Sequence, residues 1–225
     1  MCERLEEVKK RMQAAALKAG RDPSSIKIVA VSKKKPSFQI QELYDCGQKI
    51  FGENYVQEAV EKIKSLSALN DVEWHFIGHL QRNKAKLAVD YFHWIEGVDS
   101  LRLAKTINKY AIKAKKRISC LIQVNIGREE SKSGVFEEDL PELVRAFSEF
   151  TALELKGFMT IHPRSDDVEE SRYWFKKMRK LLETYQKEYP FLKELSMGMS
   201  RDFEIAIQEG ATIVRIGTAL FGPRD

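Results

Sequence analysis

The segment KIVAVSKKKP, residues 27–36, joins a short apolar strand to a basic loop that contains no glycine. A doubly wound open sheet typically carries a Gly-rich turn after its first strand. A closed barrel has no such requirement, because there each buried parallel strand is simply followed by a helix. The segment therefore favours the barrel, and the number of strand–helix units along the chain tests that choice.

Short apolar runs alternate with longer amphipathic segments along the whole chain. The strand-like runs lie at 27–32, 49–54, 73–79, 92–99, 119–126, 155–162, 194–200 and 212–218. An amphipathic segment at about 3–19 precedes the first of them. There is no linker, low-complexity tract or internal repeat. We therefore predict one domain over residues 1–225, an α/β protein with a (β/α)₈ TIM barrel and one extra N-terminal helix.

Composition narrows the class of protein. The 225 residues are 43% hydrophobic and 32% charged, and 38 Lys and Arg against 33 Asp and Glu give a net charge of +5. This excess is modest and describes a charged surface over a sizeable core better than a nucleic-acid-binding face. No apolar run reaches the ~18 residues of a membrane span, and no signal peptide is evident. We expect a cytoplasmic protein that binds neither membranes nor nucleic acid.

The cysteines and histidines give no sign of a metal site. Cys2, Cys46 and Cys120 lie far apart and form no CxxC pair, which argues against both a disulfide framework and structural zinc. His75 and His79 share one face of a strand-like run but lie too far apart for a convincing metal pair. We therefore expect no metal.

Lys33 is the first candidate site residue, since active sites of such barrels lie at the carboxyl ends of the strands. Strand alternation puts Val29, Val31 and Lys33 on one face, so Lys33 points up the barrel axis if the valines fill the interior. A partly desolvated lysine has a lowered pKa, and its neutral amine can form a Schiff base with a carbonyl. The alternative is that all three lysines of the loop are simply solvated.

The ends of the last two strands form a second candidate. Ser200 is a good helix N-cap with Asp202 in the first turn behind it, and a Gly217-Thr218 turn follows the last strand. Barrels commonly bind phosphate at this place. Arg215 shares the interior parity of its strand, where either a structural ion pair or a ligand would satisfy it. A Schiff-base lysine near a phosphate site fits a class I aldolase or a pyridoxal 5′-phosphate site.

Several longer motifs resemble those of the pyridoxal phosphate homeostasis proteins, single-domain relatives of the alanine racemase barrel. These are AVSKKKP (30–36), FGENYVQE (51–58), WHFIGHLQRNK (74–84), SKSG (131–134), LSMGMSRDFEIAIQEG (195–210) and VRIGTALFG (214–222). They run in the family's order from about residue 28 to the C-terminus.

The resemblance implies a role for each candidate. Lys33 would carry pyridoxal 5′-phosphate as a Schiff base, with Lys35 as the second lysine of the motif. Other residues are implied to bind the same cofactor: Ser200 with the Met199 backbone and Gly217-Thr218 at the phosphate, Arg215 at the pyridine nitrogen, and Asn54 near the ring. His162 could approach the cofactor or sit at the rim, and we favour the rim. The role of the SKSG loop stays open.

The same resemblance implies a protein without turnover that buffers or delivers the cofactor, with apo-enzymes as recipients. Charged helices are expected to cover much of the barrel exterior, and for that reason we expect a monomer. A guanidinium cannot accept a pyridinium proton, so Arg215 would leave the ring nitrogen unprotonated and the cofactor a weak electron sink. Since only ALFGPRD follows the last strand-like run, we also expect no second domain of the racemase kind. The alternatives are a racemase-like amino-acid enzyme, a Schiff-base aldolase and, more remotely, an RNA-binding module.

Overall fold

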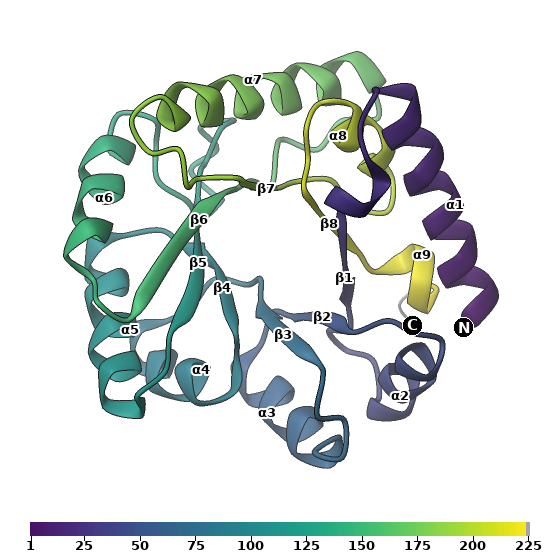
Figure 1. Ribbon diagram of the computed structural model, residues 1–225, viewed down its shortest axis with the longest axis horizontal. Helices are drawn as coiled ribbons and strands as arrows, with labels where there is room; N and C mark the ends of the chain where they lie inside the picture. Colours follow the sequence, from purple (N-terminus) through teal and green to yellow (C-terminus); the bar gives the residue numbers. More distant parts are fainter. Residues whose placement is uncertain (224–225) are drawn as a thin grey trace.

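The computed structural model describes residues 1–223, and eight parallel strands in it close into a barrel in chain order (Figure 1). Each strand is hydrogen-bonded to the next, and β8 returns to β1. The strands are β1 (Lys27–Val31), β2 (Ile50–Glu53), β3 (Glu73–Phe76), β4 (Trp94–Val98), β5 (Ile118–Gln123), β6 (Leu153–Met159), β7 (Glu194–Ser196) and β8 (Ile213–Ile216). The predicted TIM barrel is confirmed.

Helices surround the barrel, and the N-terminal helix α1 lies beside α8 and α9 on the outside of the β8–β1 seam (Figure 1). The helices are α1 (Cys2–Lys18), α2 (Ser37–Asp45), α3 (Val56–Ser65), α4 (Ala85–Tyr91), α5 (Leu101–Ala114), α6 (Leu140–Ala146), α7 (Val168–Gln186), α8 (Phe203–Gln208) and α9 (Thr218–Phe221). Side chains cap the N-termini of two of the longest helices. The Ser100 hydroxyl accepts from the Leu103 amide at the start of α5, and the Asp167 carboxylate accepts from the Glu169 amide at the start of α7.

The strands bury both faces, as a barrel requires. Val29, Leu121, Met159 and Ile213 pack together inside the barrel with Trp94. The alternate strand residues pack outward against the helices, and they belong to a much larger core. Since Val29 is interior and Ile28 and Ala30 belong to the outer core, the predicted strand parity of β1 is correct.

The strand ends differ from the predicted ones in one place that affects the site. β7 stops at Ser196, so the SMGMS segment continues as a loop and not as a strand to residue 200. Helix α8 accordingly begins at Phe203, with Asp202 as its N-cap. Ser200 does not cap this helix; its hydroxyl accepts a hydrogen bond from the Ala219 amide instead.

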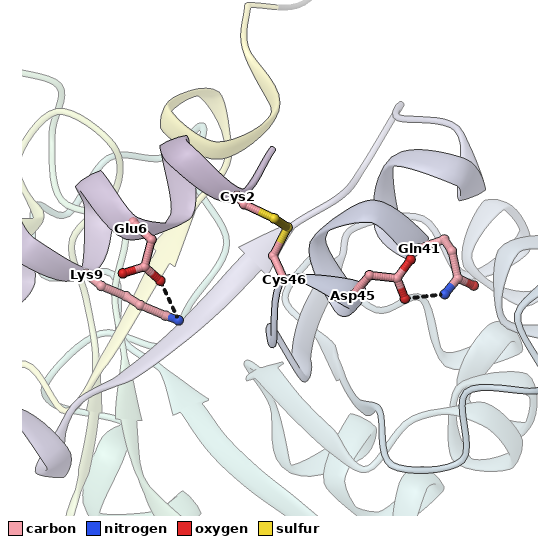
Figure 2. The surroundings of a disulfide bond; sticks show 6 residues. All are labelled: Cys2, Glu6, Lys9, Gln41, Asp45 and Cys46. Atoms are coloured by element: carbon pink, nitrogen blue, oxygen red, sulfur yellow. Dashed lines mark hydrogen bonds and ion pairs between the residues drawn. A yellow bond between two sulfur atoms is a disulfide. The ribbon is translucent and has the colours of Figure 1, made fainter.

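A disulfide between Cys2 and Cys46 corrects the expectation drawn from the cysteine spacing (Figure 2). It joins the first residue of α1 to the residue that follows α2 as its C-cap, with the two Cα atoms 5.2 Å apart. These cysteines are 44 residues apart in the sequence, and the packing of α1 against α2 brings them together. Cys120 is a buried thiol, and burial raises its pKa.

Two other expectations concern membrane-spanning segments and metal sites. Between residues 1 and 223, no helix is long and apolar enough to cross a bilayer. Over the same residues, the His, Cys, Asp and Glu side chains form no group of three or more that could hold a metal ion. His75 lies inside the barrel, whereas His79 is exposed beside Asp99.

Candidate functional site

A cavity of about 610 Å³ opens at the carboxyl ends of the strands. Its volume is typical of small-molecule and cofactor sites, which span roughly 300–1,000 Å³. Every residue that the sequence nominated for the cofactor site lines it: Lys33, Asn54, Met199, Ser200, Arg215, Gly217 and Thr218. These residues come from both ends of the chain, and the closure of β8 onto β1 brings them into one place.

Lys33 lies two residues beyond the end of β1, and the residue before it, Ser32, is fixed by hydrogen bonds. The Ser32 hydroxyl donates to Glu53 Oε1 at 2.7 Å, and the Ser32 carbonyl accepts from Lys62 Nζ at 2.8 Å. Glu53 and Lys62 are both buried, and Lys62 Nζ also donates to Glu53 Oε1 at 2.8 Å. Burial raises the pKa of the Glu53 carboxyl, and the Lys62 ammonium opposes that shift. This ion pair beneath Ser32 anchors the turn that presents Lys33 to the cavity.

The other two lysines of the loop are directed elsewhere. Lys34 has a left-handed φ of 59°, and its amide donates to Glu58 Oε1 at 2.5 Å. Lys35 Nζ donates to the Pro223 carbonyl at 2.8 Å, over the C-terminal segment. Of the three, Lys33 alone lines the cavity formed by residues 1–223. The left-handed turn at Lys34 therefore sends the Lys33 and Lys35 side chains to different places.

Asn54 brings a buried acceptor to the cavity wall. Its Oδ1 is buried and has no hydrogen-bond partner among the described residues. The position is close-packed, because a Cβ added at Gly78 would lie 2.4 Å from the Asn54 carbonyl oxygen. Since buried polar atoms in proteins almost always have a partner, an oxygen of this kind beside a cavity indicates a place for a bound polar group or water.

Ser200, Gly217 and Thr218 face each other across the loop ends of β7 and β8. Because the Ser200 oxygen accepts from the Ala219 amide at 3.2 Å, its own proton can be donated to another group. A hydroxyl and the amides of a glycine-led turn suit an oxyanion such as phosphate. Met199 differs: its amide already donates to Asp202 Oδ1 at 2.7 Å, so it could hold an anion only by giving up that bond.

Arg215 lies beneath the cavity with its guanidinium buried. One terminal nitrogen donates to Ser196 Oγ at 2.7 Å, and the other donates to the Thr160 carbonyl at 2.8 Å. No carboxylate of residues 1–223 is within ion-pair distance of it, so the structural ion pair considered from the sequence does not form. Burial lowers the pKa of Arg215, and the charges of Glu96 and Asp202 oppose this. A guanidinium at this depth remains charged because its ordinary pKa is so high.

Two residues near the mouth were left open by the sequence. His162 is buried and lines the cavity, with Nε2 3.1 Å from Asp202 Oδ2. Lys132 of the SKSG loop also lines the cavity, and its Nζ donates to the His162 carbonyl at 2.9 Å. The SKSG motif was the one signal that pointed to this loop. Arg164 and Arg201 add further positive charge to the lining; Arg201 lies within the 195–210 motif but was not nominated, and Arg164 lies in none of the quoted motifs.

The closed barrel, with its cavity at the carboxyl ends of the strands, is a single barrel of the alanine racemase type. Residues 4–225 match the family model of the alanine racemase N-terminal domain. Within that fold the chain belongs to the pyridoxal phosphate homeostasis proteins. It is 47% identical over 224 residues to the pyridoxal phosphate homeostasis protein of Aquifex aeolicus, covering 99% of this chain and 98% of that one.

Other relatives agree. The pyridoxal phosphate homeostasis protein of Escherichia coli K12 is 43% identical over 227 residues, with 98% of this chain and 95% of that protein covered. Among solved structures, PipY of Synechococcus elongatus without PLP superposes with a TM-score of 0.90 at 37% identity, over 99% of this chain and all of that one. PipY with PLP bound superposes with a TM-score of 0.84, over 96% and 100% of the two chains.

Proposed function

We propose that the protein binds pyridoxal 5′-phosphate in the cavity at the carboxyl ends of the strands, as a Schiff base on Lys33, and that it serves intracellular homeostasis of this cofactor. One observation carries the proposal: a primary amine, a hydroxyl-and-amide cluster and a buried guanidinium line the same cavity. An aldehyde, a phosphate and a pyridine nitrogen are the groups that these three would receive. The relatives' names and the PLP-bound PipY structure support it.

Each residue has a distinct part in this proposal. The Lys33 amine would condense with the aldehyde, whose oxygen would leave as water, while the Ser200 hydroxyl and the amides of Gly217 and Thr218 would hold the phosphate. Arg215 would donate to the pyridine nitrogen from below. The buried Asn54 Oδ1 would gain the polar partner that the described residues do not provide, beside the ring.

Arg215 also argues for binding without turnover. When bound, the cofactor can stabilise a carbanion, most strongly if its ring nitrogen is protonated. Arg215 has no proton acceptor to offer and so keeps that nitrogen unprotonated. We infer that a monomer of this single barrel takes up the cofactor and releases it to apo-enzymes, with no reaction of its own.

Titration of the apo-protein with pyridoxal 5′-phosphate tests the proposal. The wild type should develop the visible absorbance band of a lysine imine, the Lys33→Ala variant should not, and the matched Lys35→Ala variant should retain it. Loss of the band in Lys35→Ala with retention in Lys33→Ala would overturn the assignment.

A second measurement separates a carrier from an enzyme. The loaded protein is incubated with single amino acids in deuterated water, and exchange of the α-proton is followed by NMR. We expect exchange no faster than with free cofactor. Rapid exchange with one amino acid would contradict the absence of turnover and favour the racemase-like alternative.

A further inference from the structure

A line of buried charged side chains runs through the barrel interior beneath the cavity. It begins on β3, where Glu73 is partly exposed at the amino-terminal mouth and His75 is fully buried one strand period further in. Glu73 Oε1 lies 2.8 Å from His75 Nε2, and Glu96 Oε1 on β4 lies 2.6 Å from His75 Nδ1. The Trp94 ring stacks on the imidazole, with centroids 5.0 Å apart. His75 is therefore held in one plane between two carboxylates.

The line then crosses the barrel. Glu96 Oε2 accepts a 2.5 Å hydrogen bond from the Ser196 hydroxyl on β7, a strand that is not a neighbour of β4. The same Ser196 oxygen accepts from Arg215 at 2.7 Å. One serine thus connects the buried carboxylate to the guanidinium under the cavity. Both oxygens of Glu96 are used, one toward β3 and one toward β7.

The donors and acceptors fix the charges along this line. A carboxylate only accepts hydrogen bonds, so an imidazole with a carboxylate at each nitrogen must donate from both and carry a positive charge. The result is an alternation of negative Glu73, positive His75, negative Glu96 and positive Arg215. Burial alone would lower the pKa of His75, but its bonds to Glu73 and Glu96 raise it. Burial would raise the pKa of Glu96, yet His75, Arg215 and Ser196 together lower it.

We propose that Glu96 is the positioning residue of this site: acting through Ser196, it holds the Arg215 guanidinium in one orientation beneath the cavity, while His75 and Glu73 hold Glu96 in place from the other side. The proposal rests on the proposed function for its consequence, which is that Arg215 meets the pyridine nitrogen as a fixed donor. The bonds to Ser196 and Thr160 occupy two of the five N–H groups of Arg215. Those two bonds orient the remaining face of the guanidinium.

Other charged groups near His75 also influence its titration, so a test that varies the pH must take them into account. Lys27 of β1 lies over the Trp94 ring, 4.9 Å from its centroid, and pairs with Glu194 of β7 at 3.0 Å. His93, just before β4, lies close enough to Glu73 for their charges to interact. Arg215 of β8 completes the set. A variant of Glu96 changes the charge at the centre of this group and leaves the outer charges in place.

The first test uses the apo-protein and needs no cofactor. The ring nitrogen shifts of ¹⁵N-labelled histidine report the charge of His75 directly. In the wild type we expect imidazolium to persist well above the ordinary pKa of histidine, and in Glu96→Gln we expect titration at a pH about one unit or more lower. A neutral His75 in the wild type near pH 6, or an unchanged titration in Glu96→Gln, would overturn the proposal.

The second test measures the consequence at the cavity. Ser196→Ala removes one hydroxyl, which cuts the connection between Glu96 and Arg215 while leaving both charges. We expect both Ser196→Ala and Glu96→Gln to bind pyridoxal 5′-phosphate about tenfold more weakly than the wild type, since a hydrogen bond to a charged group is lost. The ¹⁵N shift of a labelled pyridine nitrogen in the bound cofactor should move as well.

A matched control is Glu209→Gln. Glu209 is also a buried carboxylate, but it pairs with Arg172 and Arg179 in the helical layer outside the barrel. Its loss should destabilise the protein without altering the pyridine nitrogen shift. Unchanged affinity and unchanged shift in Ser196→Ala would refute the positioning role, whereas failure of the wild type to bind the cofactor would refute the proposed function and leave the His75 result standing.

Discussion

Reduction of the Cys2–Cys46 disulfide offers a prediction whose size follows from the fold. The bond closes a ring between cysteines 44 residues apart. In the chain-entropy model, a ring of that length removes about 13 cal/mol/K of entropy from the unfolded chain, which is about 4 kcal/mol at 25 °C. We therefore expect the free energy of unfolding to fall by up to about 4 kcal/mol when the bond is reduced.

Helix α1 should stay docked after reduction, because the bond is not its main attachment. Leu5, Val8 and Ala16 are buried in the outer core, and Arg11 pairs with Glu204 of α8 at 2.6 Å. The loss of stability therefore acts chiefly through the unfolded state. We expect the circular dichroism spectrum of the folded protein and its affinity for pyridoxal 5′-phosphate to change little.

Urea unfolding with and without a reductant measures this effect. Cys46→Ser should unfold at the same urea concentration under both conditions, while Cys120→Ser should keep the full response to the reductant. Alkylation should find one thiol in the oxidised wild type and three after reduction, since the chain has three cysteines and Cys120 is the one outside the bond. A stability difference below about 1 kcal/mol, with the bond verified by mass, would refute the estimate.

Three further predictions follow from the packing and charges of the site. Gly78→Ala should lower stability by about 1–3 kcal/mol in thermal unfolding, because the added methyl would meet the Asn54 carbonyl at 2.4 Å; an unchanged melting temperature would contradict that close approach. Lys62→Met leaves the buried Glu53 carboxylate uncompensated and should cost about 3–5 kcal/mol in urea unfolding, whereas a cost under about 1 kcal/mol would show that the pair is not buried. The lowered pKa of Glu96 stabilises the fold above about pH 4.5 and loses this effect as the pH falls, while the raised pKa of His75 stabilises it below about pH 6.5 and loses this effect as the pH rises. The contribution of the interior charges should thus be largest between these values, and a Glu96→Gln variant with the same pH profile of unfolding as the wild type would contradict it.

Periodicity was sufficient to predict the barrel and the orientation of its key side chains. The alternation of apolar residues in β1 placed Val29 inside and Lys33 above it, and the same rule placed Arg215 in the interior. These predictions depend only on the two-residue period of a strand and on the closure of the sheet. The two-residue period can be read from the residues of each strand, and the closure of the sheet follows from the number of strand–helix units along the chain.

Contacts between distant parts of the chain were not predictable in this way. The disulfide joins residues that no spacing rule connects, and the bond from Glu96 to Ser196 crosses the barrel between strands that are not neighbours. No residue of the strand-like run at 92–99 was nominated for the site, yet its Glu96 lies buried in the interior beside His75. Ser200 was assigned to the wrong helix because β7 ends four residues earlier than its apolar pattern suggests.

The most direct test of the proposed function is to trap the cofactor on the chain. The protein is loaded with pyridoxal 5′-phosphate, reduced with borohydride so that any imine becomes a stable amine, digested and mapped by mass spectrometry. We predict the phosphopyridoxyl group on the peptide that contains Lys33, at that residue, with Lys35 and Lys132 unlabelled. A label on either of those lysines, or none on a protein that has bound the cofactor, would contradict the Schiff base on Lys33.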